Sequence, residues 1–66
     1  MKVCINGNLN EIDSVRTVAE LLDRLRIPAC SALIEQNGNV IGRNEFHTAA
    51  ITEGDAIEIV QMVAGG

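Results

Sequence analysis

A single stretch of this 66-residue chain has the periodicity of an amphipathic helix, and this limits the folds open to the rest. Pro28 ends the stretch because it disfavours the α region at Ile27. With one helix in the chain, its apolar stripe has only a sheet to pack against. Four residues at positions i, i+3, i+4 and i+7 form that stripe: Val18, Leu21, Leu22 and Leu25.

The start of this helix has a capping signature, because Thr17 is followed three residues later by Glu20. We expect the Thr17 hydroxyl to accept a hydrogen bond from the backbone N–H of Glu20. The Glu20 carboxylate is expected to accept in turn from the N–H of Thr17. Glu20 and Arg24 are also spaced for an ion pair on the exposed side of the helix.

Residues with β propensity fill most of the remaining chain. Asn6-Gly7-Asn8 and Asn37-Gly38 each predict a tight hairpin turn, and residues 52–55 predict the turn before the last strand. The connector 43–51 is irregular, with one short helical turn expected near Phe46. The predicted strands are residues 1–5, 9–12, 31–36, 40–41 and 56–62.

The order of elements is thus hairpin, helix, hairpin, connector and final strand. It predicts an α+β fold in which a mixed sheet of about four to five strands packs on one main helix. With the first and last strands side by side in the middle of the sheet, this is the β-grasp, or ubiquitin-like, architecture. We expect residues 1–62 to form the β-grasp domain and residues 63–66 to form a flexible C-terminal Gly-Gly tail.

Charge and size narrow the classes of function. The formal charge is −4, from nine acidic residues and five scattered basic ones. Nucleic-acid binding needs clustered Lys and Arg, so we expect no nucleic-acid partner. An acidic surface instead favours encounter with a basic patch on another protein. A catalytic cleft is hard to build from 66 residues, which favours a carrier, a binding module or a subunit over an enzyme.

The reactive side chains give little sign of a catalytic or metal site. Cys4 and Cys30 lack the spacing of metal ligands. Without an export signal or an apolar segment of membrane length, they indicate a reducing cytoplasm and no membrane partner. A hydrolase dyad of either cysteine with His47 is an alternative with little in its favour. We expect no bound metal and no bound cofactor.

Alternation in the last strand assigns its two faces. Ile57 and Ile59 are expected beneath the helix, and the residues between them point the other way. That open face is either a docking patch or an ordinary surface, and the sequence leaves both interpretations open. The candidate partner-binding residues are Leu33, Glu58, Val60 and Met62.

The last four residues form a slim, uncharged arm: Val63, Ala64, Gly65 and Gly66. A carboxylate is a poor electrophile, but coupling it to AMP supplies a leaving group that a sulfur nucleophile can displace. Gly66 has no Cβ to obstruct attack at its carbonyl, and Gly65 lets the arm bend. We therefore expect the arm to thread into a narrow active site of a partner, with the Gly66 carboxyl as the reacting group.

Four motifs follow one another along the chain: Thr17-Val18-Ala19-Glu20-Leu21-Leu22, Asn37-Gly38-Asn39-Val40-Ile41 followed by Arg43, Glu53-Gly54-Asp55, and Val63-Ala64-Gly65-Gly66. Their order and spacing resemble the ThiS family, the sulfur carriers of thiamin biosynthesis. The resemblance implies that a ubiquitin-activating-type, ThiF-like adenylyltransferase uses ATP to activate Gly66. It implies that a persulfide derived from a cysteine desulfurase then supplies sulfur. The resulting thiocarboxylate would donate that sulfur to a ThiG-like thiazole synthase.

The resemblance also implies a protein cosubstrate, monomeric when free, that docks through Val60 and Met62. Gly42 and Phe46 depart from the family, which often has proline and tryptophan at these positions. Three alternatives stay open. The chain could be a sulfur carrier for molybdopterin or another thiolated product. It could be a non-covalent β-grasp adaptor with an inert tail, or a protein modifier joined to lysines through Gly66.

Overall fold

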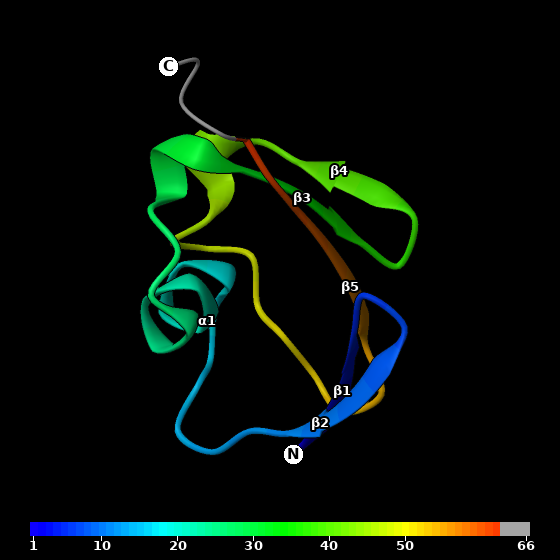
Figure 1. The fold of residues 1–66 in the computed structure, drawn as a ribbon. Helices are drawn as coiled ribbons and strands as arrows, with labels where there is room; N and C mark the ends of the chain where they lie inside the picture. The colour runs from blue at the N-terminus through cyan, green and yellow to red at the C-terminus, as the bar shows by residue number, and fades with distance from the viewer. Residues whose placement is uncertain (63–66) are drawn as a thin grey trace.

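The computed structural model of the protein describes residues 1–62, and the predicted tail at 63–66 lies outside the described residues. Figure 1 shows the elements in chain order. They are β1 (Lys2–Ile5), β2 (Asn8–Glu11), α1 (Val18–Leu25), the 3-10 turn η1 (Ala29–Ser31), β3 (Ala32–Gln36), β4 (Asn39–Ile41), the 3-10 turn η2 (Arg43–Glu45) and β5 (Ala56–Gln61). The predicted order of elements is confirmed, including the short helical turn before Phe46.

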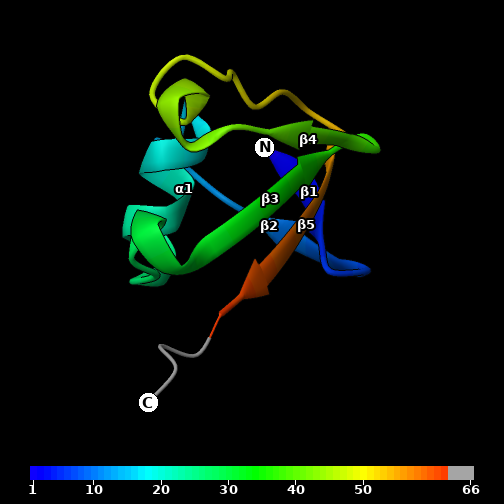
Figure 2. The ribbon, with the colours of Figure 1, turned by 90° about the horizontal axis from the view of Figure 1, so that it is seen from above.

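The five strands form one sheet in the order β2-β1-β5-β3-β4. The central strands β1 and β5 run parallel, and every other neighbouring pair is antiparallel. α1 lies across one face of the sheet, as the two views show (Figures 1 and 2). This is the predicted α+β, β-grasp arrangement, with the first and last strands adjacent in the middle.

The core lies between α1 and the covered face of the sheet, and it is aliphatic apart from Phe46. Three of the four residues in the predicted stripe are buried, but Leu25 is 40% exposed because it stands in the last turn of the helix. The connector after η2 closes one side of the core with Phe46 and Ile51. The buried residues are Val3, Ile12, Val15, Val18, Leu21, Leu22, Ala32, Ile34, Phe46, Ile51, Ile57 and Ile59.

The N-terminus of α1 is capped differently from the prediction. The Thr17 hydroxyl accepts from the N–H of Glu20 at 3.3 Å, as expected. The Glu20 carboxylate accepts from the N–H of Arg16 at 2.7 Å, one residue before the expected donor. Arg24 donates to the carbonyl oxygen of Asp13 at 2.6 Å. Within residues 1–62, Glu20 and Arg24 do not form the predicted ion pair, because each is engaged elsewhere.

The C-terminus of α1 is a left-handed turn that precedes Pro28. Arg26 has φ 60°, and its N–H donates to the carbonyl of Asp23 at 3.1 Å. The N–H of Ile27 donates to the carbonyl of Leu22 at 2.9 Å. These two bonds are those of a Schellman motif, which satisfies the last carbonyls of a helix. The helix therefore ends through this backbone turn. Pro28 lies beyond the last helical residue, Leu25, where its missing N–H breaks no helical hydrogen bond.

Candidate functional site

Within residues 1–62, nothing covers the face of the sheet opposite α1, and this face carries a cluster of exposed apolar side chains. Ile57 is fully buried and Ile59 is 8% exposed beneath α1, so the predicted faces of β5 are confirmed. Val60, which alternates with them, is 57% exposed. Its partner across the β3–β5 pairing is Leu33, which is 53% exposed. We call the part of this surface formed by β3, β4 and β5 the open face; its exposed apolar residues are Leu33, Val40, Val60 and Met62.

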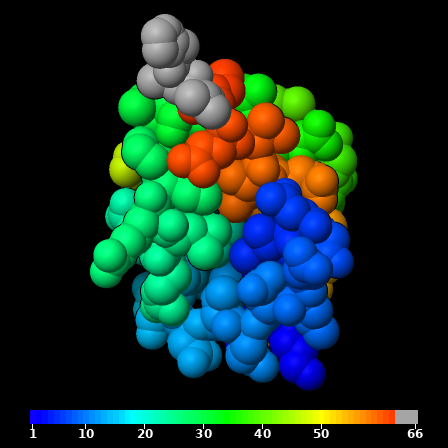
Figure 3. All heavy atoms as spheres, viewed as in Figure 1, coloured from blue at the N-terminus to red at the C-terminus, as the bar shows by residue number. Residues whose placement is uncertain are grey.

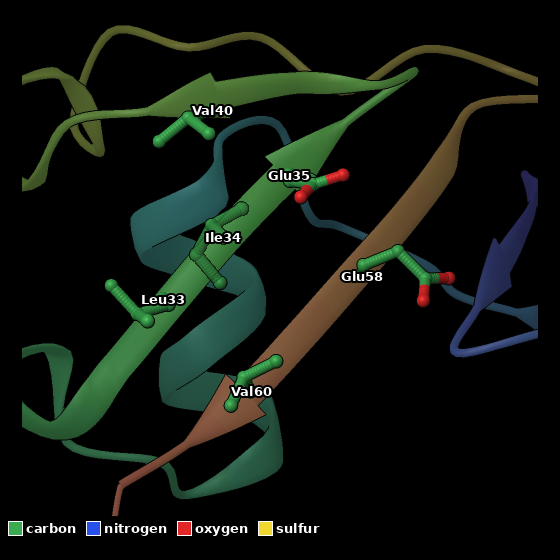
Figure 4. A pocket seen from close by; sticks show the side chains of 6 residues that line it. All are labelled: Leu33, Ile34, Glu35, Val40, Glu58 and Val60. Carbon is green, nitrogen blue, oxygen red and sulfur yellow. The ribbon is translucent and has the colours of Figure 1, made fainter.

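A shallow groove runs over the open face, between β4 and β5 and across β3 (Figure 4). α1 lies behind these strands in that view, so the groove faces away from the helix. Glu35 on β3 and Glu58 on β5 are directly opposite each other in the register, and both are exposed. The groove is lined by Leu33, Ile34, Glu35, Val40, Glu58 and Val60.

Three of the groove residues are absent from the sites predicted from the sequence: the buried Ile34 and the exposed Glu35 and Val40. The register pairs Glu35 with Val40 across the β3–β4 hairpin. The signal for that pairing was present, because the two-residue turn Asn37-Gly38 fixes which residues face each other. Side chains on paired residues point to the same face of a sheet. The prediction therefore included Leu33 and Glu58 but missed their neighbours.

The described chain stops next to the open face. β5 ends at Gln61, and the N–H of Met62 donates to the carbonyl of Ser31 at 2.7 Å, which extends the pairing with the β3 side of the sheet. Figure 3 shows the atoms of these last described residues at the molecular surface. Gly66, the predicted reacting residue, and the arm residues Gly65, Ala64 and Val63 lie outside the described residues. Their predicted roles stay predictions.

Two asparagine side chains hold β5 in the middle of the sheet. Asn6 accepts from the N–H of Ile59 at 2.7 Å and donates to its carbonyl at 3.2 Å. Asn37 accepts from the N–H of Ala56 at 2.9 Å. Both asparagines have positive φ, 50° and 52°, and a glycine with positive φ follows each of them. These are the angles of type I′ hairpin turns, so each predicted turn also clamps the last strand.

Asp55 anchors the turn that leads into β5. It is the one buried charged residue among the described residues. Its carboxylate accepts from the Thr52 N–H at 2.8 Å and from the side chains of Gln36 and Asn37 at 2.9 Å and 3.0 Å. Burial raises the pKa of Asp55, but the hydrogen bonds from Asn37, Thr52 and Gln36 outweigh it and hold the pKa below the usual 3.8.

The reactive side chains considered from the sequence lie on separate elements. Cys4 is on β1 and half-buried, Cys30 is exposed on η1, and His47 follows η2. The carbonyl of Cys30 accepts from the Arg43 guanidinium at 3.2 Å, which joins η1 to η2. Among residues 1–62, no three His, Cys, Asp or Glu residues gather as metal ligands do. In the same residues, no helix is both long and apolar enough to span a membrane.

Comparison with known proteins gives consistent results. The sequence model of the ThiS family matches residues 3–66. The sulfur carrier protein ThiS of Bacillus subtilis (strain 168) is 32% identical over 50 residues, which are 76% of each chain. The crystal structure of the thiamine biosynthesis protein (ThiS) of Geobacter metallireducens superposes with a TM-score of 0.84 at 32% identity, and all of both chains is covered.

A larger protein also contains a similar region. The thiazole synthase of Paramagnetospirillum magneticum (strain ATCC 700264 / AMB-1) is 30% identical over 66 residues. That alignment takes in all of this chain but 20% of the synthase, so the chain spans about a fifth of that relative's length.

Proposed function

The chain belongs to the ThiS family, and we propose from this that it is a sulfur carrier of thiamin biosynthesis, with sulfur held as a thiocarboxylate on Gly66. On this proposal the protein is a cosubstrate that partner enzymes load and discharge. Residues 1–62 supply the surface that partners bind, and residues 63–66 supply the arm that enters their active sites.

The chemistry explains why a carrier of this kind needs a partner. A ThiF-like adenylyltransferase would use ATP to join AMP to the Gly66 carboxylate, with pyrophosphate as the other product. The terminal sulfur of a persulfide, derived from a cysteine desulfurase, would attack that carbonyl and expel AMP. A second thiol would then attack the sulfur that belongs to the donor cysteine and form a new disulfide with it. The former terminal sulfur of the persulfide would stay on the Gly66 carbonyl as the thiocarboxylate. ATP is consumed by the partner, so the carrier itself needs no bound cofactor.

The position of the open face supports this division of labour. Met62 is 44% exposed and lies on the open face, at the point where the described chain stops. Four residues of polypeptide span at most about 14 Å when fully extended. A partner's active site therefore has to lie within that distance of Met62, and its docking surface has to lie close by. The open face meets this requirement, with Leu33, Glu58, Val60 and Met62 as the proposed contacts.

The proposed acceptor of the sulfur is a ThiG-like thiazole synthase. Its support is the thiazole synthase in which a region similar to this whole chain is part of the same polypeptide. Fusion of a carrier and a synthase in one polypeptide is expected if the carrier passes its sulfur directly to that synthase. We further propose that the free protein is a monomer in the cytoplasm.

The observation that carries the proposal is the match of the whole described domain, at 32% identity, to a ThiS structure. An intact-mass measurement tests it. The protein is incubated with a ThiF-like adenylyltransferase, ATP and a persulfide donor, and a parallel sample lacks ATP. We expect an ATP-dependent mass gain equal to the exchange of one oxygen for sulfur. An unchanged mass with an active enzyme would favour a non-covalent adaptor, and isopeptide adducts would identify a protein modifier.

A second measurement tests the acceptor. The thiocarboxylated protein is supplied to a thiazole synthase with its other substrates, and loss of the extra mass is followed against formation of the thiazole. Discharge is expected to depend on the synthase. If the thiazole synthase leaves the thiocarboxylate intact and a molybdopterin synthase discharges it, the protein is instead a sulfur carrier for molybdopterin.

A further inference from the structure

We propose that Glu35 and Glu58 form a paired carboxylate site in the groove, which receives an arginine of the partner enzyme. The apolar residues Leu33, Val40 and Val60 would contact the neighbouring apolar surface of that partner. This inference rests on the proposed function in one respect: the partners are taken to be the enzymes that load and discharge the carrier.

The first step is the geometry of the pair. Glu35 and Glu58 are Cα partners in the β3–β5 pairing. Residues directly opposite in antiparallel strands have Cβ atoms about 4.5–5.5 Å apart and project to the same face. β3 and β5 have hydrogen-bonded neighbours on both sides, so the backbone beneath both carboxylates is fixed. Figure 4 shows the two side chains on adjacent strands at one end of the groove.

The second step is charge. Like charges directly opposite in a sheet are destabilising. Among the described residues, neither carboxylate accepts a side-chain hydrogen bond or joins a salt bridge, and the groove lining contains no basic residue. Asp55 and Glu20, by contrast, use their carboxylates within the fold. Repulsion between Glu35 and Glu58 therefore lowers the stability of the free domain. It also favours the binding of a partner that places a positively charged group between the two carboxylates.

The third step is the kind of group that fits. A guanidinium is planar, carries five N–H donors and pairs with carboxylates through parallel hydrogen bonds. It can therefore bridge two carboxylates held on neighbouring strands. The rest of an arginine side chain is aliphatic and packs on apolar surface. Val40 lies opposite Glu35, and Val60 follows two residues after Glu58, so apolar contacts are available on both sides of the pair.

The test combines binding and stability in Glu35→Gln, Glu58→Gln and the double variant. Affinity is measured for the ThiF-like adenylyltransferase and the thiazole synthase separately, at low and high salt. We expect the double variant to bind at least one enzyme about tenfold more weakly, since hydrogen bonds between charged groups are lost. Its binding should also depend less on salt. The denaturation midpoint of the free variant should rise, because the repulsion is removed.

Asp23→Asn is the matched control. Asp23 is exposed on α1, on the other side of the molecule from the groove, and its substitution also removes one negative charge. Its affinity should stay close to that of the wild type. A loss with Asp23→Asn equal to that of the single variants Glu35→Gln and Glu58→Gln would mean that only net charge matters, and this would overturn the paired site.

The inference and the proposed function fail in different ways. Wild-type affinity of the double variant for both enzymes overturns the inference, even if the protein accepts sulfur. A protein that gains no sulfur, yet binds an enzyme through Glu35 and Glu58, overturns the sulfur-carrier proposal alone. A concentration-dependent dimer that the double variant abolishes, seen by analytical ultracentrifugation, would assign the groove to a second copy of the chain and overturn the enzyme as occupant.

Discussion

The carboxamide of Asn6 pairs with the backbone of Ile59 as a residue of a neighbouring strand would, accepting at 2.7 Å and donating at 3.2 Å. β1 ends at Ile5, where the chain turns into the first hairpin. The Asn6 side chain nevertheless continues the pairing on β5, 53 residues further along the chain. The first hairpin turn thus fixes the part of β5 that carries Val60.

Replacement of Asn6 by alanine tests this clamp. The variant loses two hydrogen bonds and places a residue with a Cβ but no polar side chain at φ 50°. We expect the free energy of unfolding to fall by about 1–3 kcal/mol in chemical denaturation. Asn8→Ala is the control, because Asn8 is exposed and its side chain makes no hydrogen bond within residues 1–62. Equal effects of the two substitutions would contradict the clamp.

Asp55 predicts a dependence of stability on pH. Its pKa in the folded protein lies below the usual 3.8, so the ionised carboxylate stabilises the fold above that pH. The stabilisation is lost as the pH falls through 3.8 and then through the folded-state pKa. We expect Asp55→Asn to be clearly less stable than the wild type at pH 7, with the difference narrowing below pH 4 in urea denaturation. A difference that is independent of pH would show that the charge of Asp55 is not what stabilises the turn.

Val60→Asp tests the open face. Val60 is 57% exposed, so we expect the free energy of unfolding to change by less than about 1 kcal/mol. Affinity for the adenylyltransferase should fall much more, as measured by calorimetry. Leu9→Asp is the control: Leu9 is 71% exposed on the same side of the sheet, but it lies on β2, two strands from β5, and does not line the groove. A large loss of stability with unchanged affinity would reverse the proposed role of this surface.

On the buried face of β5, in contrast to the open face, we expect a substitution to lower the stability of the fold strongly. Ile57 is fully buried beneath α1, and its replacement by alanine leaves a cavity. We expect the free energy of unfolding to fall by about 2–5 kcal/mol, a large share of the stability of a small domain. If Ile57→Ala were no less stable than Val60→Ala in the same denaturation series, the packing of β5 against α1 would be wrong.

Removal of Gly66 separates folding from function. Every residue of the buried core lies between Val3 and Ile59, so a protein lacking Gly66 should melt at the temperature of the full chain. It should accept no sulfur in the intact-mass experiment, because the new terminal carboxyl on Gly65 would stop one residue, about 3.5 Å of extended chain, short of the reacting position. Unfolding of the shortened protein, or normal loading with sulfur, would each contradict this prediction.

The sequence predicted the elements of this fold well because its signals are periodic and local. The helical stripe, the two Asn-Gly turns and the alternation in β5 each depend on near neighbours, and the structure confirms them. The shape of the groove depends instead on which strands become neighbours. Glu35 and Val40 were missed for that reason, although the hairpin turn between them fixes their pairing.

Side-chain hydrogen bonds were harder to predict than elements. The spacing of Glu20 fits both a capping role and an ion pair with Arg24, and local geometry decides between them. The tripeptide Asn-Gly-Asn occurs twice in the sequence, at 6–8 and 37–39, and predicts two turns. That both turns bind β5 follows only from the placement of β5 between β1 and β3.

This placement has a mechanical consequence. A pull on the polypeptide beyond Met62 loads β5 in shear along both neighbouring strands, so many hydrogen bonds resist the force together. A strand at the edge of a sheet would be peeled away one bond at a time. An unfoldase that engages the chain from this end therefore has to separate β5 from two neighbouring strands before it reaches any other element.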